Sequence, residues 1–258
     1  MTAITEQELD WQTWHAQREA DLDTDYGWLT VVAFNWLPVE PAEIPGLPGK
    51  WWAQDGQAHV TSASGLKLNG EPLTGTTSAS VPEAGSLSWL LHGDKLVELV
   101  LRGGRYAIRQ RDPRAATRVG FSGVPTFEVD PAWKVTGHYT PYEEPQRVEV
   151  STARADLRQH VTAVGTVHLA LGDSAHELVA TSAGGGRLSL SFYDETNGVE
   201  TAPWRTVTTE PLDGWTVAVD FNRAINLPFA FTDYGTCPAP VVGNRLGLDV
   251  TAGEKAPR

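Results

Sequence analysis

The second half of the chain alternates hydrophobic and polar residues, and this pattern constrains the fold more than any other feature. Five hydrophobic residues fall on one side of residues 160–171: Val161, Ala163, Val167, Leu169 and Leu171. Because side chains of a strand point to alternate faces, this spacing predicts a half-buried strand. Gly172-Asp173 then supplies a two-residue turn. That turn would place Val167 opposite Leu178 and Leu169 opposite His176, so the pattern and the turn agree on a β-hairpin.

Further strands follow at short spacing. Gly184–Gly186 predicts the next turn, and Asn197-Gly198 is a strong signal for another tight hairpin. Such a meander must bury its hydrophobic face, either by closing into a barrel or by packing on a second sheet. We therefore predict a barrel-like half over residues 146–258, with a tail rich in proline and glycine wrapped around it from Asn226 onward.

Residues 1–26 predict a helix. Thr5 and Glu8 form a capping-box pattern, and hydrophobic or long side chains recur at helical spacing at Trp11, Trp14 and Leu22. Two tryptophans on one face need a groove, so we expect this helix to lie against the body of the protein.

Residues 27–119 contain short strands divided by turn residues, and Gly103-Gly104 predicts a hairpin between two of them. This spacing is typical of a β-sandwich. Residues 120–145 contain several prolines and predict a connector with some strand in it, over residues 133–140. The fold class expected from the whole pattern is mainly β.

Composition excludes several functions. The chain has 20 lysine and arginine residues against 32 aspartate and glutamate residues, a formal net charge of −12. Phosphate backbones and anionic membranes attract clustered positive charge, so we expect neither nucleic acid nor a membrane as a partner. The single cysteine, Cys237, rules out an intramolecular disulfide and a cysteine-based zinc site. The start of the chain lacks the pattern of a signal peptide, and no apolar run approaches the ~20 residues that span a bilayer. A cytoplasmic location is the expectation.

Several segments carry a family resemblance. The longest are Gly103–Arg109, Val129–Val135, Val219–Ala224, Thr236–Pro238, Asn244–Leu246 and Ala252–Glu254. Together they resemble the uncharacterised bacterial and archaeal proteins catalogued as domain of unknown function 1684. The resemblance implies a forkhead-associated-like β-sandwich followed by a β-barrel-like half, and it implies no activity. Many relatives have a cysteine where this chain has Phe229, so a two-cysteine metal site or redox pair is excluded here. The phosphothreonine-reading residues of forkhead-associated domains are not recognisable between Lys50 and Asp112.

Isolated reactive residues provide little support for catalysis or metal binding. Cys237 lies in Thr-Cys-Pro, which is no cysteine-hydrolase motif, and we expect a buried, unreactive thiol. His160 and His168 lie eight residues apart in one predicted strand, about 26 Å at ~3.3 Å per residue, so they cannot share an ion. His176 should face the side opposite to His168. No metal or cofactor is predicted.

One polar cluster near the C-terminus remains as the candidate site: Asp220, Asn222, Arg223, Asn244, Arg245 and Glu254. Asp220 and Asn222 should share a face at the end of the last strand, and we expect Asp220 and Arg245 to be neighbours. One interpretation is structural, in which these side chains satisfy backbone groups of an irregular tail. The other is a polar pocket that binds a small polar or anionic molecule.

Three functions stay open. The first is a small-molecule-binding protein with its pocket at the Asp-Phe-Asn-Arg motif, residues 220–223. The second is an enzyme with acid–base chemistry around Asp220. The third is a scaffold or protein-interaction module that uses the sandwich half, which an exposed apolar patch there would favour. A displaced pKa in the pocket would favour the enzyme.

Overall fold

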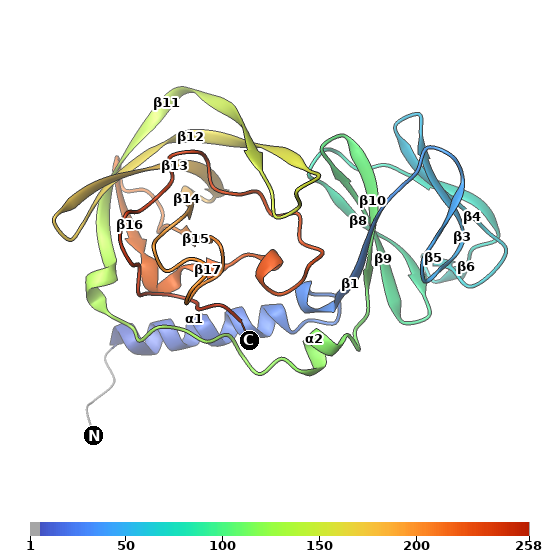
Figure 1. The fold of residues 1–258 in the computed structure, drawn as a ribbon, viewed down its shortest axis with the longest axis horizontal. Helices are drawn as coiled ribbons and strands as arrows, with labels where there is room; N and C mark the ends of the chain where they lie inside the picture. Colours follow the sequence, from blue (N-terminus) through green and yellow to red (C-terminus); the bar gives the residue numbers. More distant parts are fainter. Residues whose placement is uncertain (1–5, 258) are drawn as a thin grey trace. The chain divides into compact units, whose positions relative to one another are not determined.

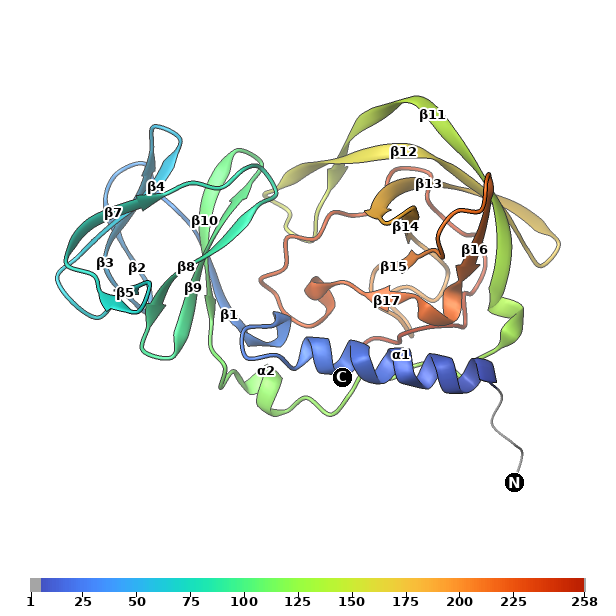
Figure 2. The ribbon, with the colours of Figure 1, turned by 180° about the vertical axis from the view of Figure 1, so that it is seen from behind.

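The computed structural model describes residues 6–257, so Thr5 of the expected capping box lies outside the described residues. Strands account for 49% of the chain and helices for 13%, which confirms the mainly-β prediction. The chain divides into two compact units (Figure 1 and Figure 2). Unit 1 comprises Met1–Ala20, Ser122–Phe231 and Gly235–Arg258, and unit 2 comprises Asp21–Phe121 and Thr232–Tyr234.

Unit 2 is a β-sandwich of two antiparallel sheets. The larger sheet has the order β1 (Val31–Trp36), β10 (Arg105–Arg111), β9 (Lys95–Arg102), β8 (Ser86–His92), β5 (Lys67–Leu68) and β6 (Glu71–Pro72). The smaller has the order β2 (Ala42–Ile44), β3 (Leu47–Gln54), β4 (Gln57–Ser62) and β7 (Gly75–Ala79). Trp51 and Trp89 meet edge to face in the core between them, with ring centroids 5.8 Å apart. A short helix, α2 (Ala116–Val119), follows the last strand of the sandwich.

The hairpin expected at Gly103-Gly104 is present. Arg102 pairs with Arg105, and both glycines have positive φ, +58° and +73°. A two-residue turn with positive φ at both central positions suits glycine, because an L side chain there would be strained.

Unit 1 is built on one curved antiparallel sheet. Its order is β16 (Thr216–Asp220), β11 (Lys134–Ser151), β12 (Arg158–Leu171), β13 (Ser174–Gly184), β14 (Arg187–Phe192), β15 (Arg205–Thr208) and β17 (Ile225–Asn226). Val167 pairs with Leu178 and Leu169 with His176, as the alternation and the Gly172-Asp173 turn predict. The Gly184–Gly186 turn is also present, since Gly184 pairs with Arg187.

The sheet of unit 1 does not close into a barrel, because β16 and β17 end it without pairing with each other. Segments from outside the sheet fill its concave side instead. The tail contributes Leu246, Val250 and Ala252, all fully buried, to the same core as Val167 and Leu178. Figure 1 shows the tail crossing the inside of the curled sheet.

Helix α1 (Glu6–Leu22) lies along unit 1, as the tryptophan spacing predicts. The indole nitrogen of Trp11 donates a hydrogen bond of 2.7 Å to the backbone carbonyl of Asn222. Arg18 donates to Glu254 at 3.0 Å and to the carbonyl of Asn226 at 2.9 Å. The helix is therefore fixed to the segments that follow β16.

Two local expectations fail. Asn197-Gly198 forms no tight hairpin, because β14 ends at Phe192 and β15 begins only at Arg205. Asn197 instead donates its amide hydrogens to Asp194 and Thr201, which organises a longer loop.

Strand β11 continues through Pro141 and Pro145, where sequence predicted a connector with a shorter strand. The pairing of β11 with β12 shifts register between Pro141 and Gln146. Pro141 is the last residue paired before this bulge, opposite Gly165, and Pro145 lies within the unpaired stretch, so neither proline ends the strand.

Candidate functional site

The Asp220–Arg223 motif stands where β16 ends. Residues Phe221–Arg223 form a short 3-10 helix, η3, and the Asp220 carboxylate accepts a hydrogen bond of 3.1 Å from the backbone nitrogen of Asn222. The alternation of the strand therefore stops at Asp220. Asp220 and Asn222 still meet, because the Asn222 amide donates to Asp220 at 2.9 Å.

Asn222 is a structural residue. Its side chain accepts from the backbone nitrogen of Asp130 at 3.0 Å and donates to the carbonyl of Asp130 at 2.9 Å. Its own carbonyl accepts from Trp11, so this buried asparagine joins the motif to helix α1 and to the segment before β11. Little of it remains available to a ligand.

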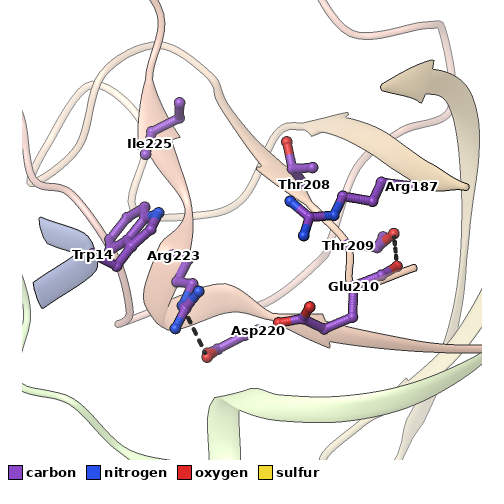
Figure 3. Close-up of a pocket in the computed structure, with 8 residues that line it drawn as sticks. All are labelled: Trp14, Arg187, Thr208, Thr209, Glu210, Asp220, Arg223 and Ile225. Atoms are coloured by element: carbon purple, nitrogen blue, oxygen red, sulfur yellow. Dashed lines mark hydrogen bonds and ion pairs between the residues drawn. The ribbon is translucent and has the colours of Figure 1, made fainter. Parts of the chain in front are cut away.

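Asp220 and Arg223 line a cavity of ≈ 160 Å³, which Figure 3 shows with its eight lining residues. Trp14 of α1 and Ile225 of β17 supply apolar side chains to its wall. The remaining lining residues are Arg187, Thr208, Thr209 and Glu210. The cavity lies within unit 1 and combines two arginines with two carboxylates.

The charges of the cavity are unevenly paired. Nε of Arg223 lies 3.8 Å from Oδ2 of Asp220, and another guanidinium nitrogen lies 2.5 Å from the Asp10 carboxylate. The Arg223 guanidinium also lies 5.5 Å from the ring centroid of Trp14. Arg187 and Glu210, by contrast, form no ion pair within residues 6–257.

The other predicted site residues lie elsewhere in unit 1. Glu254 is fully buried, and it accepts from Arg18 at 3.0 Å and from the backbone nitrogen of Asn226 at 2.6 Å. Asn244 bonds both backbone groups of Val179 and the carbonyl of Ser191. These two side chains hold the tail in place, as the structural interpretation of the cluster expects.

Arg245 does not reach Asp220. It is exposed, and its guanidinium lies 3.5 Å from the Glu195 carboxylate and 5.4 Å from the ring centroid of Tyr193. The expected pair of Asp220 and Arg245 is not formed, because Asp220 bonds Asn222 and faces Arg223 instead.

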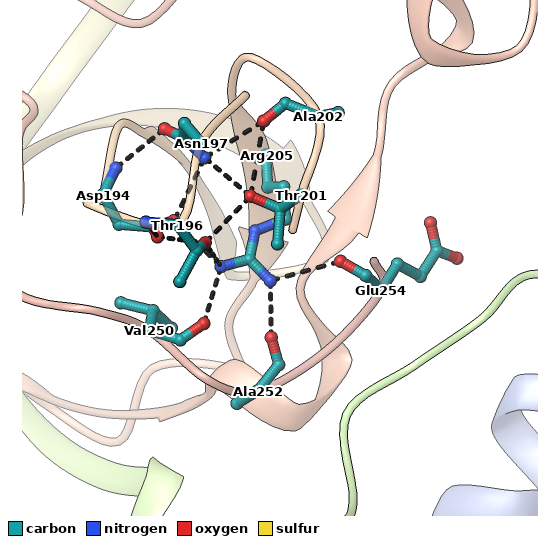
Figure 4. Close-up of polar contacts among 9 residues, drawn as sticks. All are labelled: Asp194, Thr196, Asn197, Thr201, Ala202, Arg205, Val250, Ala252 and Glu254. Carbon is teal, nitrogen blue, oxygen red and sulfur yellow. Dashed lines mark hydrogen bonds and ion pairs between the residues drawn. The ribbon is translucent and has the colours of Figure 1, made fainter. Parts of the chain in front are cut away.

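A buried polar cluster around Arg205 was not predicted from the sequence. Arg205 and Asp194 are both fully buried as a salt bridge of 2.8 Å. Arg205 also donates to the carbonyls of Ala252 and Val250, at 2.5 and 2.8 Å, and Figure 4 shows its guanidinium enclosed by the 194–202 loop and the tail. Burial lowers the pKa of Arg205, and the charge of Asp194 opposes that shift. No sequence motif marks Arg205, so only the folded structure reveals this clamp.

The remaining candidates are readily placed. Cys237 is buried next to Trp204, as expected for an unreactive thiol. Within the described part of the chain, no group of three or more histidine, cysteine, aspartate or glutamate side chains is arranged to hold a metal ion. The helices between residues 6 and 257 are all too short or too polar to cross a membrane.

Comparison with models of protein families shows which family the chain belongs to. The model of the family described as protein of unknown function (DUF1684) matches residues 119–255, slightly more than half of the chain. The chain belongs to the DUF1684 family. The DUF1684 match includes all six candidate residues and every residue of the cavity wall except Trp14.

A solved structure is also similar. It is the solution NMR structure of an uncharacterised protein of Haloarcula marismortui, with 29% sequence identity and a TM-score of 0.45. The similarity covers 54% of this chain and 78% of that chain. No curated protein matches.

Proposed function

We propose that this DUF1684 protein binds a small polar molecule with an anionic group in the cavity beside residues 220–223. The observation that carries the proposal is the unpaired guanidinium of Arg187 on a cavity wall that also contains Arg223. Arginine presents several N–H donors in a fixed fork that matches a carboxylate or a phosphate. A bound anion would give Arg187 the counter-charge that residues 6–257 do not provide.

The size and the remaining lining narrow the ligand class. A volume of ≈ 160 Å³ is below the roughly 300–1,000 Å³ of pockets that hold drug-sized ligands, so the ligand is smaller than a typical drug-sized molecule. Glu210 and Asp220 can accept hydrogen bonds from hydroxyl or ammonium groups, and Trp14 offers an apolar surface. These features support a small hydroxy acid, amino acid or phosphate ester.

A thermal-shift screen against small carboxylates and phosphates tests the proposal. A ligand present at 100 times its Kd stabilises the folded state by about 2.7 kcal/mol, and should raise the melting temperature by roughly 5–11 °C. Arg187→Ala should remove this shift, because it removes the free guanidinium. Arg158→Ala is the matched control, since Arg158 is an exposed arginine on the same sheet and outside the cavity. A shift that persists in Arg187→Ala would contradict the proposal.

The two carboxylates on the wall support an enzyme as the second candidate. Glu210 and Asp220 both line the cavity, and general acid–base chemistry requires positioned groups of this kind. The discriminating experiment incubates an identified ligand with the protein and analyses the products. For an enzyme, Asp220→Asn should keep ligand binding and lose turnover, whereas a binding protein leaves the ligand unchanged in both forms.

A further inference from the structure

Two histidines lie side by side on the outer face of the unit 1 sheet. His138 of β11 pairs directly with His168 of β12, and Glu177 of β13 pairs with His168 from the other side. The neighbours of these histidines along the strands are buried on the opposite face: Gly137, Tyr139, Val167 and Leu169. Because side chains alternate along a strand, the two imidazoles point outward. The side chains of His168 and Glu177 are 42% and 71% exposed, which leaves them accessible.

The register of a bulged strand pair creates this arrangement. His138 and His168 are far apart in sequence, and the bulge between Pro141 and Gln146 lies within the hairpin that joins them. A shift of one residue would move His138 away from His168 and onto the other face. Spacing along the sequence shows only how far apart histidines of one strand lie, such as His160 and His168. It cannot show that His138 and His168 face each other across two strands.

The local chemistry suits a metal ion. Directly opposed residues of an antiparallel pair have Cβ atoms about 4.5–5.5 Å apart, so two imidazoles can bind one ion at Zn–N distances of about 2.0–2.1 Å. Nδ1 of His168 lies 3.1 Å from Oε1 of Glu177. Metal-binding histidines commonly donate their second ring N–H to a carboxylate, which fixes the tautomer and turns the other nitrogen toward the ion. Because Glu177 contacts Nδ1 of His168, Nε2 is the ring nitrogen that remains for an ion.

We propose that His138 and His168 bind one divalent transition-metal ion of the zinc class, with Glu177 as the positioning residue. Zinc in proteins is usually four-coordinate, so water would complete the coordination of an ion held by two protein ligands. The shallow depression over this row is also lined by Leu169 and His176 and by five small residues that leave room for that water: Thr136, Gly137, Ala170, Ala175 and Thr216. None of its residues lines the cavity beside residues 220–223, so the metal site is independent of the proposed function.

Calorimetric titration of tag-free protein with zinc chloride tests the proposal. The wild-type protein should bind one zinc ion. His138→Ala and His168→Ala should each weaken binding on the order of tenfold or more, and the double variant should abolish it. His160→Ala is the matched control, because His160 is an exposed histidine on the same strand that contacts Arg147 and Glu149 instead. Its zinc affinity should equal that of the wild type.

Melting temperatures of all variants should match that of the wild type, because the substituted side chains are accessible, and a lowered value would identify a variant that fails to fold. Wild-type protein without zinc binding, or a double variant that binds as tightly as the wild type, would overturn the proposal. Equal weakening by His160→Ala would do so too, because it would place the ion elsewhere. Glu177→Gln should weaken binding without abolishing it, and an unchanged affinity would overturn the positioning role of Glu177.

Discussion

Single polar residues of unit 1 divide into clamps and cavity-lining groups, and burial decides which role each has. Arg205, Asp194 and Glu254 are fully buried with several partners each, so they hold backbone segments together. Arg187 is exposed and Arg223 is half-buried at the cavity, where solvent or a ligand can reach them. A charged residue type alone does not distinguish these roles.

Arg205→Ala should be strongly destabilising, because it leaves the Asp194 carboxylate buried without its partner. Removing one member of a buried pair costs about 3–5 kcal/mol, which for a chain of this size lowers the melting temperature by roughly 6–20 °C. Arg245→Ala is the control, since an exposed pair contributes about 0–1 kcal/mol.

Adding Asp194→Asn to Arg205→Ala should recover part of the loss, because the double variant no longer buries an unpaired charge. Thermal denaturation of the wild type, Arg205→Ala, Asp194→Asn and the double variant measures the coupling between the two residues. Equal melting temperatures for Arg205→Ala and Arg245→Ala would contradict the role of Arg205 as a clamp.

Asp112 in unit 2 gives a pH-dependent contribution to stability. The backbone N–H of Arg114 and the ammonium group of Lys95, 2.9 and 3.2 Å away, hold the pKa of Asp112 below its usual value of 3.8. The folded state therefore favours the carboxylate. Its contribution is present above the unfolded pKa and is lost as the pH falls through the lower folded value.

Urea denaturation of the wild type and Asp112→Asn tests this sign. The wild type should be the more stable of the two at about pH 6, and the difference should shrink as the pH falls below the usual value of 3.8 and through the lower folded pKa. A difference that stays constant over this range would show that the charge of Asp112 is not its source.

At the scale of elements, the tail of unit 1 acts as part of the core rather than as a loose end. Leu246 and Val250 are fully buried in the same cluster as the strands, and Asn244 bonds the backbone of β13 and β14. Side chains of the tail thus satisfy backbone groups that the sheet leaves unpaired where β13 and β14 diverge.

Asn244→Ala should loosen the tail locally. The substitution leaves the backbone N–H of Val179 without its acceptor, and because this group is only partly buried the cost should be near the lower end of the about 1–3 kcal/mol of an orphaned buried group. Amide hydrogen exchange should therefore speed up at Val179 and in the tail, while the centre of β12 stays protected. Exchange that accelerates equally across the whole sheet would indicate a general loss of stability instead.

At the scale of the whole molecule, both functional proposals belong to unit 1. Its cavity takes Trp14 from α1, Arg187 from β14, Glu210 from the segment after β15 and Asp220 from the end of β16. The histidine pair lies on the outer face of the same sheet, between β11 and β12. Unit 2 contributes a sandwich with its own core around Trp51 and Trp89. The DUF1684 match also lies almost wholly in unit 1.

The sequence by itself determined the local structure. Alternating hydrophobic residues and glycine turns predicted the pairing of Val167 with Leu178, because strand period and turn geometry act within a few residues. Helix α1 was predicted for the same reason, from side chains that recur at helical spacing. The tight hairpin predicted at Asn197-Gly198 was wrong, because the buried residues Asp194 and Thr201 accept hydrogen bonds from Asn197 and organise a longer loop.

Only the tertiary structure decided which distant residues meet. The register across a bulge set His138 opposite His168, and the path of the tail assigned Glu254 to Arg18 and Arg245 to Glu195. Each of these pairings depends on the packing of separate segments around a common core, which a local pattern does not encode.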